Sequence, residues 1–346
     1  MRPSRPSSSR RFSCTAVFGL VLAVGVIACS FARTASAASA PPKSLSYYEH
    51  GFNQSLAHLN QRMRNQGHKA GASGISKQVV FLDFGALRVS GTGFGQQLFG
   101  YNAPVISLSR ALAAAEQFSI GYHNGWQTPK TGSITIAWGT SNGRIPTGWS
   151  SSTITSAGTA FAGTVTDLRS YVRNQAYNRQ YVSSAMDIEE DVQHGWNDYP
   201  PTHTFVDAFR GVTNAPFLIN FGSDEIGTFR TPQPGFGSWT ADAVVHLSRS
   251  SRTAACPQIY NTTRGQEWAQ TEVIADDLGT PIYFFCTMAQ TSPTATNLSA
   301  ADAWNVLHTD LATINPSFNY VAPAHNYLGS RTTVIGCRGA TYCSTP

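Results

Sequence analysis

The residues whose types and spacing best suit chemistry follow one short apolar run near the middle of the chain. Residues 184–191 read Ser-Ala-Met-Asp-Ile-Glu-Glu-Asp, so four carboxylates follow that run in a chain with only 12% charged residues. Side chains two apart in a β-strand point to the same side. We therefore expect Asp187 and Glu189 to lie together and Glu190 to turn away. Like charges at close range raise the pKa of one carboxyl group, so one acid can stay protonated beside an ionised partner.

Paired carboxyl groups are what the hydrolysis of a glycosidic bond requires. One carboxylic acid protonates the leaving oxygen, and the second carboxylate acts as nucleophile, base or charge stabiliser. Acids at i and i+2 on a strand can approach to about 5–7 Å, inside the range of separations that such enzymes use. We assign Glu189 as the general acid because its longer side chain reaches further. Asp187 would orient groups or stabilise charge, and Asp83 would be a third acid.

Alternating strand and helix patterns must position these acids. Apolar runs predict buried strands at 78–85, 133–139, 181–188, 216–222, 257–261 and 281–286. Apolar steps of three and four predict helices between them and a further helix from Leu45 to Met63, whereas residues 243–247 suit either element. The alternation predicts an α/β fold, a (β/α) TIM-like barrel forming a single large domain. An open doubly wound sheet is the alternative, but the first strand lacks the Gly-rich phosphate-binding sequence.

Further candidate residues stand at strand ends or in the loops that follow them, because the C-terminal ends of barrel strands carry the active site. Flat aromatic faces stack on sugars, and amide groups can hydrogen-bond to them. Each residue also has a structural alternative, which is a cap or turn for the polar ones and core packing for a tryptophan. The expected substrate-binding residues are Trp138, Asn220, Trp239, Tyr260 and Gln290.

The first 37 residues have the order of a secretory signal. Arginines precede an apolar run from Ala16 to Ala28 that is short for a membrane span, and Ala35-Ser36-Ala37 offers a cleavage site. We expect a secreted protein with a signal peptide at 1–37, an N-terminal helical segment at 38–76 and the barrel at 77–346. Residues 26–29 resemble a lipobox, so a lipid anchor at Cys29, with attachment to the cell envelope, is the alternative.

Charge argues against a nucleic-acid partner. The chain has 24 basic and 19 acidic residues, and five arginines but no acid lie in the first 37 residues. The remainder is therefore neutral, and it has no cluster of basic residues with interleaved aromatics. We expect neither nucleic acid nor a stable membrane span among its interactions, and we expect a monomer.

Cysteine usage indicates disulfides rather than a metal site. The four cysteines beyond the signal predict two disulfides in an exported chain. Of three pairings we favour Cys256–Cys286 and Cys337–Cys343, since the second closes a short loop. Zinc on these thiols is disfavoured because no two cysteines are two residues apart. We expect no cofactor and no metal, although His194 and His203 could bind a metal with Asp191.

A family resemblance follows from two of these motifs. The Asp-x-Glu at the end of a mid-chain strand, together with Leu82-Asp83 at the end of the first predicted strand, resembles the family 25 glycoside hydrolases, the lysozyme-type muramidases. The Asp-Ile-Glu strand is also similar to one found in a group of secreted actinobacterial proteins. The resemblance implies site roles for Asp83, Asp187 and Glu189, with Glu189 as the acid. It implies the β-1,4-linked amino-sugar backbone of peptidoglycan as substrate. The family motif continues with a small aliphatic residue and serine, where this chain has Phe84-Gly85.

The sequence therefore supports a secreted glycoside hydrolase that acts on cell-wall or related polysaccharide by carboxylate acid–base catalysis. A non-catalytic extracellular carbohydrate-binding or envelope protein on the same scaffold is the alternative. An envelope lipoprotein anchored at Cys29 is a third hypothesis. Convergence of the three acids in an open cleft would favour the enzyme, whereas separated or hydrogen-bond-saturated acids would favour the binding protein.

Overall fold

The computed structural model describes residues 41–49, 56–100, 102–126, 132–141, 145–190, 196, 198–249, 252–290, 298–314 and 331–337. The side chains of residues 56, 57, 290 and 331–337 are not included in that description. The predicted signal at 1–37 with Cys29 therefore lies outside the described residues. So do Asp191, His194 and the predicted Cys337–Cys343 disulfide.

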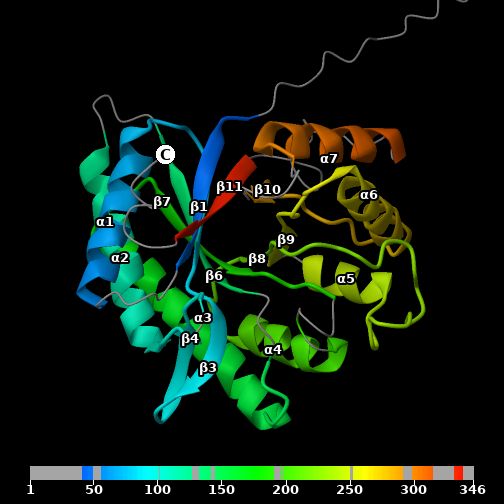
Figure 1. Ribbon diagram of the computed structural model, residues 1–346, viewed down its shortest axis with the longest axis horizontal. Coiled ribbons are helices and arrows are strands. Elements are labelled where there is room, and N and C mark those ends of the chain that lie inside the picture. The colour runs from blue at the N-terminus through cyan, green and yellow to red at the C-terminus, as the bar shows by residue number, and fades with distance from the viewer. Residues whose placement is uncertain are drawn as a thin grey trace, which may run out of the picture. The chain divides into compact units, whose positions relative to one another are not determined.

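Eight parallel strands form the central sheet, in the order β10-β11-β1-β2-β6-β7-β8-β9 (Figure 1). Each later strand of this sheet follows a helix. Strands that are adjacent in the sheet are also consecutive among these eight strands along the chain, and β11 lies beside β1. The strands are β1 Lys43–Glu49, β2 Gln78–Asp83, β6 Ile134–Thr140, β7 Gln180–Met186, β8 Leu218–Asn220, β9 Thr253–Ala255, β10 Thr287–Gln290 and β11 Arg331–Cys337.

The two end strands of this sheet meet and close it into a barrel. Gln258, just after β9, forms a parallel bridge with Met288 of β10, and Ala255 forms another with Phe284. The backbone N–H of Met288 donates to the Pro257 carbonyl at 2.8 Å, and that of Ile259 donates to the Met288 carbonyl at 2.9 Å. This arrangement is that of a (β/α) barrel. The predicted α/β TIM-like fold is therefore confirmed.

Helices connect the barrel strands, and side chains cap several of them. Ser150 accepts a hydrogen bond from the Thr153 N–H, and Asn261 accepts one from the Arg264 N–H, as N-cap residues do. Among the described residues, no helix combines the length and apolar character needed to cross a membrane. The helices are α1 Leu56–Ala72, α2 Leu108–Gly125, α3 Ser151–Asn174, α4 Tyr199–Gly211, α5 Ala241–Ser248, α6 Thr262–Asp277 and α7 Ala300–Ile314.

A small antiparallel sheet is inserted between β2 and α2. It consists of β3 Ala86–Ser90, β4 Gly93–Gln97 and β5 Val105–Ser107, paired in that order. Phe94 of β4 packs against Trp149, with ring centroids 5.7 Å apart. The insertion therefore contacts the loop between β6 and α3, at the same end of the barrel as the carboxyl ends of the strands.

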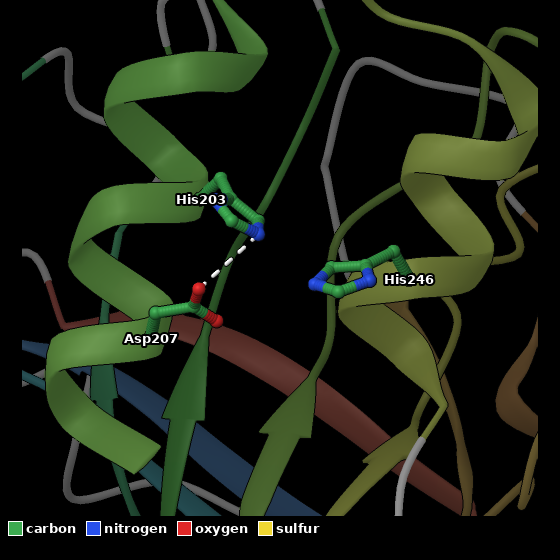
Figure 2. Close-up of side chains that lie close together, drawn as sticks. All are labelled: His203, Asp207 and His246. Carbon is green, nitrogen blue, oxygen red and sulfur yellow. Dashed lines mark ion pairs between the residues drawn. The ribbon is translucent and has the colours of Figure 1, made fainter. Parts of the chain in front are cut away.

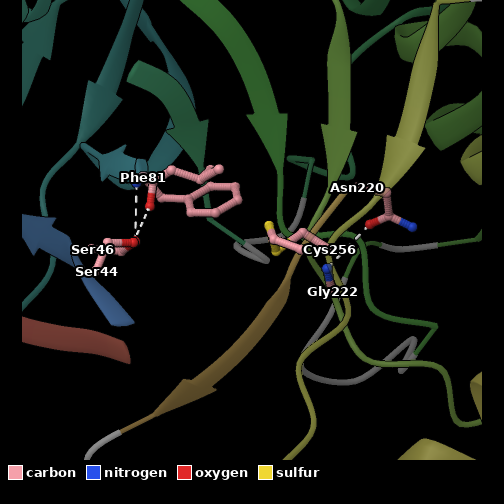
Figure 3. Close-up of a disulfide and its surroundings, with 8 residues drawn as sticks. Ser44, Ser46, Phe81, Asn220, Gly222 and Cys256 are labelled. Carbon is pink, nitrogen blue, oxygen red and sulfur yellow. Dashed lines mark hydrogen bonds between the residues drawn. A yellow bond between two sulfur atoms is a disulfide. The ribbon is translucent and has the colours of Figure 1, made fainter. Parts of the chain in front are cut away.

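Alternation along the strands creates an inner and an outer core. The inner core surrounds the Cys256–Cys286 disulfide, which confirms that predicted pair, and includes Phe81 (Figure 3). Serine side chains extend the pairing of β1 with β2: Ser44 Oγ donates to the Val79 carbonyl at 2.7 Å, and Ser46 Oγ accepts from the Phe81 N–H at 3.0 Å. Apolar residues on the opposite strand faces form the outer core with the helices.

The N-terminal part of the chain differs from the sequence-based expectation. Residues 43–49 form β1 inside the barrel sheet, and the helix begins at Leu56. The predicted helix from Leu45 was wrong for these residues, and the barrel does not begin at residue 77. Helical spacing of Leu45 and Tyr48 concealed a period of two, in which Ser44, Ser46 and Tyr48 share one face.

The remaining elements follow the predicted alternation, but β9 and β10 lie beside the predicted strands at 257–261 and 281–286 rather than on them. Residues 243–247 belong to a helix, α5, and β11 was not predicted. Helix α1 continues beyond Met63, the predicted end, to Ala72, and Gly67 within it allows close packing. A Cβ at Gly67 would lie 2.0 Å from the Phe118 carbonyl oxygen of α2.

Candidate functional site

Asp187 lies at the carboxyl end of the barrel, where side chains from other strands hold it. It follows β7, and its side chain is 3% exposed. The Tyr48 hydroxyl of β1 donates to Asp187 Oδ2 at 3.5 Å, and Gln258 Nε2, just beyond β9, donates to Asp187 Oδ1. Both carboxylate oxygens are therefore held by donors from segments far apart in the sequence.

Glu189 and Asp187 both lie close enough to Tyr260 for their charges to act on its phenol. Burial, and then the charges of Asp187 and Glu189, raise the pKa of the Tyr260 phenol. Burial raises the pKa of Tyr48 well above its ordinary value, and Asp187, Tyr260, Asp83 and Glu189 each add to this shift. Both phenols therefore remain protonated at neutral pH and can donate hydrogen bonds. Glu189 is only partly buried, so it is more accessible than Asp187.

Asp83 ends β2 and is fully buried. Its Oδ1 accepts a hydrogen bond from the Gly85 N–H at 2.7 Å, whereas Oδ2 has no hydrogen-bond partner among the described residues. Burial raises the pKa of Asp83 to about 7; the Gly85 N–H opposes this shift, and the charge of Glu49 adds to it. Asp83 can therefore exchange a proton near neutral pH.

Glycines make room for Asp83 on both sides. Gly139 is its register partner on β6, and a Cβ there would lie 3.2 Å from the Asp83 Cβ. Gly85 has φ +90°, and a Cβ there would lie 1.9 Å from the Gln97 carbonyl oxygen. Substitution at Gly85 would therefore disturb the backbone that donates to Asp83.

The loop after β8 packs closely against the Asp-Ile-Glu segment at Gly222. A Cβ at Gly222 would lie 1.8 Å from the Ile188 carbonyl oxygen, so only glycine fits this approach. The Gly222 N–H donates to Asn220 Oδ1 at 3.1 Å, and its carbonyl accepts from the Gln258 N–H at 3.2 Å. One backbone position thus contacts the chain between Asp187 and Glu189 and also orients Gln258.

The structure separates the residues that we expected to bind substrate. Trp138 is fully buried on the outer side of the sheet, where its Nε1 donates to Gln96 Oε1 at 2.7 Å. Asn220 points toward α5 and donates to Ser248 Oγ at 3.0 Å. Trp239 is fully buried against Tyr199. The structure therefore corrects the prediction that these three residues bind substrate. Each lies either on the side of its element away from the acids or enclosed by other side chains.

Among the members of that group whose side chains the structure describes, Tyr260 alone lies beside the acids. The side chain of Gln290 lies outside the described residues. Sequence reasoning missed Tyr48, because its segment had been interpreted as a helix. It also missed Gln258, although the alternation Cys256, Gln258, Tyr260 would have placed that residue on the inner face.

Glu190 turns away from Asp187, as expected, but into the protein rather than toward solvent. It is fully buried and accepts a hydrogen bond from the Glu225 N–H at 3.2 Å. Burial raises the pKa of Glu190 well above its usual value, and the charge of the equally buried Asp224 adds to that shift. The Thr271 hydroxyl and the Ile226 N–H donate to Asp224, which indicates a structural role for this second acid pair.

A hollow of about 630 Å³ lies among the loops at the same end of the barrel. Its lining comes from the loop after β6, the starts of α3 and α4, and Gly237. It offers the partly buried Trp149 together with Pro200 and Pro201, and Asp198 is its one acid. Flat apolar surfaces of this kind suit the faces of sugar rings.

One further motif follows β6. Residues 139–143 read Gly-Thr-Ser-Asn-Gly, which has the spacing of a serine-hydrolase nucleophile elbow. That elbow requires a sharp turn from a strand directly into a helix. Here β6 ends at Thr140 and α3 begins at Ser151, so the required context is missing.

Comparisons with known proteins add a limited likeness. No family model matches the sequence, and no curated protein matches it. Among solved structures, a GH18 chitinase from Pseudoalteromonas aurantia is similar at a TM-score of 0.43 and 12% identity, covering 85% of this chain and 94% of that one. An endo-1,4-beta-mannanase from Rhizomucor miehei has a TM-score of 0.43 and 10% identity, covering 88% and 92%. The homocysteine methyltransferase of Escherichia coli has a TM-score of 0.45 and 10% identity, covering 87% and 94%. Different activities thus occur among these similar structures, and the barrel assignment rests on the strand pairing above.

Proposed function

We propose that this protein is a secreted glycoside hydrolase whose site lies at the carboxyl end of the barrel. The observation that carries the proposal is the contact of the Tyr48 phenol with Asp187, beside Asp83, which pairs with Tyr48 between β1 and β2; the charge of Glu189 acts on the same phenol. Carboxyl groups that differ in burial at one site are suited to divide acid and base roles between them. The location is also the end of the barrel at which enzymes of this fold carry out chemistry.

Each acid has a role that fits its surroundings. Glu189 is the general acid, because it is the most accessible of the three and lies at the rim of the cluster. Asp187 is held by Tyr48 and Gln258, so its charge has a fixed direction and would stabilise positive charge on the sugar. Asp83 is buried and has a pKa of about 7, so it can hold or release a proton near neutral pH.

The substrate we propose is a polysaccharide that contains amino sugars, with peptidoglycan first among them. Support comes from the resemblance of Asp187-Ile-Glu189, at the end of the fourth barrel strand, to the family 25 muramidases. Asp83 ends the second barrel strand rather than the first, because β1 precedes β2. The resemblance therefore rests on the Asp-x-Glu segment alone. The hollow beside Trp149 would hold sugar units next to the cleaved bond.

A non-catalytic carbohydrate-binding protein is the second candidate. The observation that favours it is the state of Asp187, which is 3% exposed and has both oxygens engaged. A carboxylate held in this way can serve as a fixed structural element. In that case the Trp149 hollow would bind a glycan that the protein does not cleave.

An activity assay with matched variants separates the two candidates. The purified protein would be incubated with peptidoglycan, chitin and mannan, and the release of reducing ends would be measured. We expect release from at least one amino-sugar polymer, and a loss of about 100-fold or more in Glu189→Gln and Asp187→Asn. Asp277→Asn, on the exposed end of α6, is the control and should retain full activity. Binding of a polymer without release by the wild type would establish the second candidate instead.

A further inference from the structure

A second cluster of chemistry-bearing side chains lies outside the barrel, between α4 and α5 (Figure 2). His203 and Asp207 come from α4, and His246 comes from α5. One possible ligand atom from each of the three lies within 4.8 Å of the other two. We propose that His203, Asp207 and His246 bind a divalent transition-metal ion of the zinc type, with water completing the coordination.

Helix geometry brings the first two ligands together. His203 and Asp207 are four residues apart, so they lie on the same face of α4 one turn from each other. His203 Nε2 lies 3.2 Å from Asp207 Oδ2. Ligand atoms around a tetrahedral zinc ion, each about 2.0–2.1 Å from the metal, are about 3.4 Å apart. This pair therefore already has the spacing of two zinc ligands.

The third ligand comes from the neighbouring helix. The rings of His203 and His246 lie with their centroids 4.8 Å apart. The side chains of His203 and Asp207 are 37% and 50% exposed, so both can rotate toward His246 by the small distance that coordination requires. Tyr199 packs against both histidine rings and forms one wall of the cluster.

His246 has a ring nitrogen available to a metal ion. Its Nε2 is buried and has no hydrogen-bond partner among the described residues. A neutral imidazole carries a free lone pair, and such a nitrogen is the commonest metal ligand in proteins.

The charges around the cluster limit its affinity without blocking it. Arg210 Nη1 lies 3.7 Å from Asp207 Oδ1, on the side away from the oxygen that faces His203. The other end of the guanidinium is occupied, because Nη2 donates to the His246 and Leu247 carbonyls at 3.2 and 3.1 Å. Arg210 thus stays beside α5 while Asp207 Oδ2 faces the metal position. One carboxylate and two imidazole rings then form the ligand set.

The bound ion would act as a clamp between two helices. Helix α4 follows the segment that carries Asp187 and Glu189, and α5 follows the loop that contains Gly222. A metal bridging His203 and His246 would link these helices on the outside of the barrel. We expect the ion to affect the stability of the protein rather than the chemistry at the carboxyl end of the barrel. The inference therefore does not depend on the proposed hydrolase activity.

Metal titration tests the proposal directly. The purified full chain, with a tag that lacks histidine, would be treated with a chelator and titrated with Co²⁺ while the visible absorption is recorded. Zn²⁺ would then be added in competition. We expect one equivalent of Co²⁺ with the spectrum of a four-coordinate N/O site, displaced by Zn²⁺. We also expect the melting temperature to rise when Zn²⁺ is present.

Variants decide whether these residues form the site. His203→Ala, Asp207→Asn and His246→Ala should each weaken Co²⁺ binding at least tenfold and abolish the rise in melting temperature with Zn²⁺. His58→Ala, at an exposed position of α1, is the matched control and should bind as the wild type does. His203 is partly exposed, so His203→Ala gives a folded test even if His246→Ala does not fold. Absence of saturable binding, or binding unchanged in His203→Ala, would overturn the proposal.

Discussion

Replacing Asp83 by asparagine should remove a pH-dependent loss of stability. Asp83 is fully buried, and burial raises its pKa from 3.8 to about 7. Each pKa unit corresponds to about 1.4 kcal/mol, so ionising this group in the folded protein costs about 4 kcal/mol more than in the unfolded chain. Asparagine can still accept the hydrogen bond from the Gly85 N–H but cannot ionise.

The direction of the effect follows from proton linkage. Below about pH 4, Asp83 is protonated in both states and contributes no difference. Between that pH and about 7 the folded protein keeps the proton that the unfolded chain releases, so stability falls by about 1.4 kcal/mol per pH unit. Above this window both states are ionised and the loss is complete. Asp83→Asn should therefore gain up to about 4 kcal/mol over the wild type between pH 4 and 8.

Urea unfolding followed by tryptophan fluorescence, at intervals from acidic to alkaline pH, would measure this gain. The other buried acids titrate alike in both proteins and cancel from the comparison. Asp277→Asn, exposed at the end of α6, is the control and should follow the wild-type curve. Parallel curves for Asp83→Asn and the wild type would refute the reasoning, since Asp83 would then be solvated or paired in solution.

Three further substitutions test other parts of the account. Gly222→Ala would place a methyl group 1.8 Å from the Ile188 carbonyl oxygen. It should lower the free energy of unfolding in urea by about 1–3 kcal/mol and reduce any glycan hydrolysis. Unchanged stability and activity would show that the loop moves to accommodate the methyl group without cost. Glu272 is fully buried with a pKa raised mainly by burial to about 8. Glu272→Gln should thus increasingly exceed the wild type in stability as the pH rises from about 4.5 to 8, and equal stability at pH 8 would contradict this prediction. Removing the Cys256–Cys286 disulfide, which spans 30 residues, by a double alanine substitution should cost about 3 kcal/mol or more, as measured by denaturant midpoints. An unchanged midpoint would mean that the inner core alone holds these strands.

The fold was readable from the sequence wherever strands are long and apolar. The β2 and β6 strands have this character because both of their faces are largely buried. The β1 strand was not predicted, because its inner face carries Ser44 and Ser46 in place of apolar residues. Their hydroxyls form hydrogen bonds with β2. The β11 strand was missed altogether.

The site was partly readable for a related reason. Asp187 and Glu189 were singled out because a period of two would place them on one face, and both of their charges act on Tyr260. The same period should have excluded Trp138, which immediately precedes the inward-facing Gly139. Contacts across the barrel, such as Tyr48 and Gln258 with Asp187, depend on closure of the sheet. No local pattern in the sequence encodes them.

The central claim is that Glu189 delivers a proton to a leaving sugar at the barrel mouth. The most direct measurement compares wild type and Glu189→Gln on a chito-oligosaccharide and on an aryl glycoside of the same sugar, whose leaving group needs no protonation. We predict a loss of at least about 100-fold on the oligosaccharide and a much smaller loss on the aryl glycoside. Equal losses on both substrates, or full activity of Glu189→Gln on the oligosaccharide, would contradict the account.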